Sequence, residues 1–133
     1  MTNEEKVTHW VNLSDENVRV AEDLLKFKHL LQTGFFCHLA IETVFKACYM
    51  KIKNDTPPFI HALDVLAKRS GFYELLSEEQ QNFIDILAPF NIEARYPEYK
   101  NKLAESLTQQ RCKYLLKETK NLLQWTKENV LLI

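Results

Sequence analysis

Apolar positions near the start of the chain recur at helical spacing. Steps of three and four residues predict one buried stripe on a helix from about Asn3 to Gln32. Thr2 and Glu5 have the spacing of a capping box at its start. We expect Gly34 to end this helix, because glycine tolerates the left-handed conformation that follows a helix. The stripe consists of Val7, Val11, Ser14, Val18, Ala21, Leu25 and Lys28.

A second apolar pattern predicts a helix from about Phe35 to Lys53. Pro57 and Pro58 follow it, and proline disfavours helical geometry in the residue before it. The short loop at Gly34 makes the first two helices antiparallel neighbours.

Two shorter helices come next. One covers Ile60 to Ser70 and stops at Gly71. The other opens with a capping box of Ser77 and Gln80 and runs to about Ala88.

The C-terminal third begins with a stretch, Pro89 to Asn101, that we expect to be irregular. The last helix begins near Ser106 or Thr108 and continues to about Val130. No strand alternation occurs over a useful length, and the chain has only 2 glycines for hairpins and bulges. Residues 1–133 are therefore predicted to form one all-α domain, an antiparallel up-and-down bundle of about five helices, four long or medium and one short.

Charge is balanced overall but uneven along the chain. A net charge of −1 excludes a strongly basic nucleic-acid binder, although a local patch stays open. Residues 1–25 carry a net charge of −4 and residues 95–120 a net charge of +4. We expect two solvated helix faces that attract each other, and the basic segment is also consistent with phosphate binding.

The cysteines and the hydropathy argue against disulfide-linked, metal-binding, secreted and membrane-spanning proteins. Cys37, Cys48 and Cys112 form no metal-binding or disulfide pattern, so we expect reduced, buried thiols and neither a metal nor another cofactor. The polar start and the lack of a long apolar run predict no signal peptide and no membrane span. A cytoplasmic location follows as the expectation.

His38, Glu42 and Lys46 are spaced four residues apart and share one helix face. The pattern could serve proton transfer or metal binding, but a structural hydrogen bond from His38 to Glu42 is favoured, with Glu42 and Lys46 as an ion pair. His61, at the start of the third helix, either caps that helix or points into a site.

The segment after Pro89 holds the strongest binding candidates. Arginine offers a planar fork suited to phosphate, and tyrosine offers a face on which a base can stack. The alternative is that Arg95 pairs with an acid and the tyrosines close the end of the bundle. The candidate nucleotide or RNA site comprises Arg95, Tyr96, Tyr99, Lys100 and Lys102, with His38, Glu42, Lys46 and His61 as supporting residues.

Taken in order along nearly the whole chain, these segments resemble the HEPN family of higher eukaryote and prokaryote nucleotide-binding domains. The resemblance rests on Trp10, residues 18–25, 38–42, Lys46-Ala47, 57–63, 90–100 and Trp125. It implies a helical bundle that commonly dimerises. It also implies a minimal nucleotidyltransferase as the partner, in a toxin–antitoxin pair.

Many HEPN relatives are metal-independent ribonucleases with an arginine, four to six further residues and then a histidine. Arg95 resembles that arginine, but Lys100, Asn101 and Lys102 stand where the histidine would be. The sequence therefore favours a binding module without catalytic residues. The alternatives are a ribonuclease toxin that uses His38 or His61, and a structural homodimer formed through the apolar excess of the first two helices.

Overall fold

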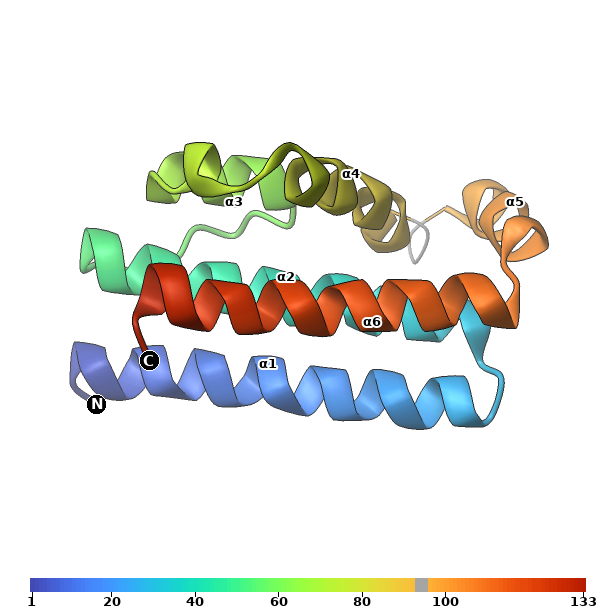
Figure 1. Cartoon of the computed structure of the whole chain (residues 1–133), viewed down its shortest axis with the longest axis horizontal. Coiled ribbons are helices and arrows are strands. Elements are labelled where there is room, and N and C mark those ends of the chain that lie inside the picture. Colours follow the sequence, from blue (N-terminus) through green and yellow to red (C-terminus); the bar gives the residue numbers. More distant parts are fainter. Residues whose placement is uncertain (93–95) are drawn as a thin grey trace.

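The computed structural model describes residues 1–92 and 96–133, and its elements there are all helical, with no strand (Figure 1). The predicted all-α bundle is confirmed, with six α-helices in the described residues rather than five. They are α1 (Asn3–Lys26), α2 (Leu30–Lys53), α3 (Leu63–Ser70), α4 (Glu78–Ile92), α5 (Pro97–Ser106) and α6 (Gln109–Thr126), with a 3-10 turn at Tyr73–Leu75 and a π-helical turn at Lys127–Leu131.

Helix α2 is the centre of the fold. It packs against α1, α3, α4 and α6, and Ile41, Val44 and Phe45 are fully buried (Figure 1). The Phe45 ring meets Phe72 edge-on at 5.0 Å between centroids. A helix that is apolar on all sides must be buried, which explains why α2 rather than a terminal helix occupies the core.

Small and polar residues let α1 and α2 pack closely. The Ser14 hydroxyl donates to the Ala40 carbonyl at 2.6 Å, and the Asn17 amide donates to the Thr43 hydroxyl at 3.4 Å. Ser14 and Ala21 have no exposed surface. The predicted stripe on the first helix is thus confirmed from Val11 to Leu25.

The turn between α1 and α2 comes earlier than predicted. Helix α1 ends at Lys26, and Lys28 takes a left-handed φ of 64°. The His29 amide donates to the Leu24 carbonyl at 2.9 Å, and the Lys28 amide donates to the Leu25 carbonyl at 3.0 Å. These two bonds form a Schellman end with lysine at the position that usually holds glycine. The expected helix to Gln32 was wrong for this reason, and Lys28 lies outside the stripe.

Gly34 lies inside α2 and ends no helix. A Cβ atom there would come within 2.2 Å of the Phe90 ring. The glycine therefore allows the end of α4 to approach α2, which is a packing role and not a turn role.

The stretch from Pro89 to Asn101 is more helical than predicted. Helix α4 continues through Pro89 to Ile92, and α5 begins at Pro97. Proline is tolerated at the first position of a helix, because its missing N–H would have had no partner there. Helix α3 begins at Leu63 rather than Ile60.

Several predicted helix ends are confirmed by hydrogen bonds. The Gln80 amide donates to the Ser77 hydroxyl at 3.1 Å, and the Ser77 amide donates to the Gln80 side-chain oxygen at 2.8 Å. The Thr2 hydroxyl accepts from the Glu5 amide at 3.1 Å. In the same way Thr108 caps α6, and Gly71 ends α3 with a φ of 93°.

The three cysteines are free and buried, as predicted. Burial raises the pKa of the Cys37 thiol to about 12, so it stays protonated at neutral pH. None of the helices in the described part of the chain is long and apolar enough to cross a membrane.

Two ion pairs join the acidic face of α1 to the C-terminal region. Glu22 lies 3.4 Å from Lys120, and Asp15 lies 2.6 Å from Lys127. The first pair confirms the expected attraction between the two charged segments. The other bases from Lys100 to Lys117 form no ion pair within the described residues, so they remain available.

Candidate functional site

A buried carboxylate, Glu42, gathers the four supporting residues on α2 and on the segment before α3. Its Oε2 atom lies 3.0 Å from Lys46 Nζ and 3.1 Å from His61 Nδ1. Glu42 and Lys46 are 4% and 7% exposed, so their charges are compensated by each other rather than by water. The predicted Glu42–Lys46 ion pair is confirmed.

His38 is close to this carboxylate but does not hydrogen-bond to it. Its Nδ1 atom is 3.7 Å from Glu42 Oε1, which is too long for a hydrogen bond. Burial lowers the pKa of His38 to about 4, although Glu42 opposes that effect. The predicted His38–Glu42 bond was therefore wrong, and His38 is a neutral core histidine at pH 7.

His61 holds the segment between α2 and α3 against α2. Its side chain is 41% exposed, so one side of the ring faces solvent while Nδ1 contacts Glu42. Ala62 is the N-cap of α3, so the expected capping by His61 was wrong. A carboxylate that orients an imidazole can support proton transfer. The lysine of the cluster is out of reach of solvent, because Lys46 is buried beside the half-buried Trp10, with Nζ 5.7 Å from its ring centroid.

The described residues contain no group of three histidine, cysteine or acidic side chains arranged to hold a metal ion. The contacts of this cluster hold separate elements together. They join α2, the segment before α3 and, through Lys46, the first helix.

The principal predicted site lies elsewhere, around α5. Arg95 falls outside the described residues. Tyr96 precedes α5 and is 55% exposed, and Tyr99 lies in the first turn of that helix. Lys100 and Lys102 are exposed on α5. The supporting cluster sits at the middle of α2, whereas α5 lies at one end of the bundle, so the two groups do not form one site (Figure 1).

The end of the bundle that carries α5 also carries the turn between α1 and α2 and the start of α6, away from both termini (Figure 1). The Cys112 thiol on α6 donates to the Leu30 carbonyl on α2 at 3.4 Å, which joins these segments. Residues 23–30 and 96–113 contain six bases and three acids, although the whole chain has a net charge of −1. We call the six exposed bases the basic end: Lys26, Lys28, Lys100, Lys102, Arg111 and Lys113.

None of these six bases forms an ion pair with another residue in the described ranges. Arg111 instead stacks on Tyr114, with 5.0 Å between its guanidinium carbon and the ring centroid. Lys26 and Lys28 were missed as site residues, because in the sequence they read as part of a continuing helix. The sequence offers no signal for a helix end there, because Lys28 has no turn preference.

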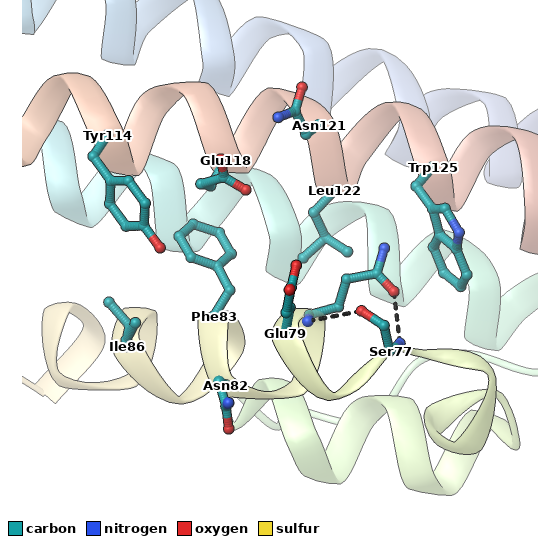
Figure 2. A pocket seen from close by; sticks show the side chains of 11 residues that line it. Ser77, Glu79, Asn82, Phe83, Ile86, Tyr114, Glu118, Asn121, Leu122 and Trp125 are labelled. Atoms are coloured by element: carbon teal, nitrogen blue, oxygen red, sulfur yellow. Dashed lines mark hydrogen bonds between the residues drawn. The ribbon is translucent and has the colours of Figure 1, made fainter.

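A groove of about 660 Å³ lies on another face, between α4 and α6 (Figure 2). Phe83 and Tyr114 meet edge-on across it at 6.2 Å between centroids, and Trp125 stands at one end. Its charged lining residues are Glu79 and Glu118, and no base lines it. An acidic rim repels phosphate, so this groove is not the predicted nucleotide or RNA site.

Comparison with known proteins gave one finding. The family model of the HEPN domain matches residues 7–130, which is nearly the whole chain. No curated protein matched, and no solved structure matched.

Proposed function

The chain belongs to the HEPN domain family, and from this premise we propose that it is a binding module whose nucleotide or RNA surface lies around Arg95 at the basic end. The observation that carries the proposal is the set of exposed bases on α5, which follows Arg95 in the sequence. Lys100 and Lys102 follow it on α5, and no acid among the described residues pairs with them. Unpaired cations attract the phosphates of a polyanion and release its counterions on binding.

The remaining features support binding more than catalysis. His38 is neutral and buried, and His61 is engaged by Glu42 at the middle of α2, away from the basic end. We therefore propose that RNA is bound there and not cleaved. Incubation with RNA in the presence of EDTA tests this, and metal-independent cleavage that is lost in His61→Gln would contradict it.

The phosphate surface is tested by titrating a labelled single-stranded RNA and, separately, ATP at several KCl concentrations. Arg95→Gln and the double variant Lys100→Gln/Lys102→Gln should weaken binding. Each lost phosphate contact should reduce the slope of log affinity against log salt by about 0.7.

The matched control is Lys6→Gln/Lys53→Gln, two exposed lysines at the opposite end of the bundle. It should keep the wild-type affinity. An equal loss in this control would mean that net charge alone drives binding, and the site assignment would be wrong.

The proposed partner is a minimal nucleotidyltransferase, in a pair of the toxin–antitoxin type. The support for this part of the proposal is membership of the HEPN family. The surface chemistry by itself does not specify a protein partner. Affinity purification of the tagged chain from its native cells, followed by mass spectrometry, tests it. A nucleotidyltransferase should be recovered in stoichiometric amount, and its absence from repeated purifications would contradict the pairing.

A further inference from the structure

The turn between α1 and α2 presents an aromatic ring to solvent among positive charges. Phe27 is 70% exposed. Lys26 precedes it, and Lys28 and His29 follow it, and all three are exposed. An exposed phenylalanine at a helix end contributes little to the core, so most of its ring surface is open to a ligand.

The backbone of this turn is fixed. Its Schellman hydrogen bonds hold Lys28 at a φ of 64°, where a side chain is disfavoured and glycine is usual. The Phe27 amide also donates to the Asp23 carbonyl at 3.2 Å. This well-bonded turn fixes the backbone from which the ring and its flanking charges project, so the backbone there needs no further ordering when a ligand binds.

The turn is part of the basic end. The Leu30 carbonyl that accepts from Cys112 is three residues from Phe27, and Arg111 and Lys113 flank that cysteine. The turn, the start of α6 and α5 share one end of the bundle (Figure 1), and each of these segments carries exposed cations.

We propose that Phe27 is a stacking platform for a base of single-stranded RNA, with Lys26 and Lys28 holding the phosphates on either side. Proteins that bind single strands combine an aromatic face for the bases with a basic track for the backbone. A duplex hides its base faces, so this arrangement selects an unpaired strand. The inference rests on the proposed RNA-binding function and adds a second contact region to it.

The experiment measures binding of a labelled single-stranded RNA of about twelve nucleotides and of the same sequence as a duplex. Phe27→Ala should weaken single-strand binding about tenfold and leave duplex binding nearly unchanged, because stacking on one base is lost. Phe27→Trp should retain the affinity, whereas Phe27→Leu, which is apolar without an aromatic face, should behave like alanine.

Phe59→Ala is the matched control. Phe59 is 99% exposed, but its neighbours are Pro58 and Ile60 and it lies on the segment between α2 and α3. It should not change RNA affinity. Lys28→Gly removes one cation while supplying the residue that the turn favours, so it should lower the affinity and the salt slope without unfolding the chain.

The outcomes separate the two proposals. If Phe27→Ala binds the single strand like wild type while Arg95→Gln and Lys100→Gln/Lys102→Gln bind weakly, the stacking platform is wrong and the phosphate surface stands. Equal losses for single strand and duplex, or an equal loss in Phe59→Ala, would also overturn it. If wild type binds ATP but no RNA, the stacking platform is wrong, and if it binds neither, both proposals fail.

Discussion

At the scale of single residues, burial affects the charge states and the bonding partners of the polar side chains on α2. Glu42 and Lys46 compensate each other inside the bundle, and His38 beside them is held neutral. His61 is half exposed and bonds to the same carboxylate. All four have side chains of the kinds found in catalytic sites, yet Lys46 and His61 both bond to Glu42, and these bonds hold the segment before α3 against α2.

The neutral state of His38 makes stability depend on pH. The pKa of His38 is about 4 in the folded chain, against an ordinary value of 6.5. Between these two pH values the unfolded chain binds a proton at this residue and the folded chain does not. The free energy of unfolding should therefore fall as the pH drops from 7.5 to 5, by about 2 kcal/mol from this residue. Urea unfolding at several pH values measures it.

The variant His38→Gln should lose that part of the pH dependence, even where it lowers stability at every pH. His9→Gln, at an exposed position of α1, is the control and should keep the wild-type slope. An unchanged slope in His38→Gln would show that the histidine is not held neutral.

At the scale of elements, close contacts set the boundaries that local sequence signals leave open. Gly34 was expected to end a helix, but the Phe90 ring requires it inside α2. The turn occurs instead at Lys28, a residue with no turn preference. The packing of α4 on α2 and the charged turn between α1 and α2 therefore both follow from contacts between elements.

Gly34→Ala tests the contact between α2 and α4. In an unconstrained helix this change would stabilise by up to about 1 kcal/mol. Here the new methyl group would meet the Phe90 ring at 2.2 Å, so we expect a loss of roughly 1–3 kcal/mol in denaturant unfolding. Gly34→Ala/Phe90→Leu should recover part of that loss, and a stabilised single variant would mean that α4 does not pack there.

At the scale of the whole molecule, charge and apolar surface are distributed on different faces. The basic end lies at α5 and the turn after α1, and acids of α1 pair with Lys120 and Lys127 along its length. The homodimer prediction was based on the many apolar residues of the first two helices. Much of that apolar surface is buried in the core, where Ile41, Val44 and Ala21 have no exposed surface. A groove lined by apolar side chains and by two acids, Glu79 and Glu118, remains between α4 and α6.

We still expect a homodimer, and we propose that the apolar side chains of this groove form its contact surface. Sedimentation equilibrium at micromolar concentration should give the mass of two chains. Ile86→Lys, in the half-buried wall of the groove, should shift the protein toward monomer, because a charge in an apolar interface is costly. A monomeric wild type would contradict the prediction, and a dimer unaffected by Ile86→Lys would place the interface elsewhere.

The sequence by itself determined the helical class, the buried stripe from Val11 to Leu25, the capping box at Ser77 and the start of the last helix near Ser106 or Thr108, because these depend on residues within one or two helical turns. It also identified Glu42 with Lys46 as a pair, since both lie on one helix face. Only the tertiary structure decided where α1 ends, that α5 is a helix, and that His61 reaches Glu42. It alone brought Phe27 and its lysines to the same end of the bundle as α5 (Figure 1). These features depend on contacts between residues far apart in the chain, and a local pattern holds no information about them.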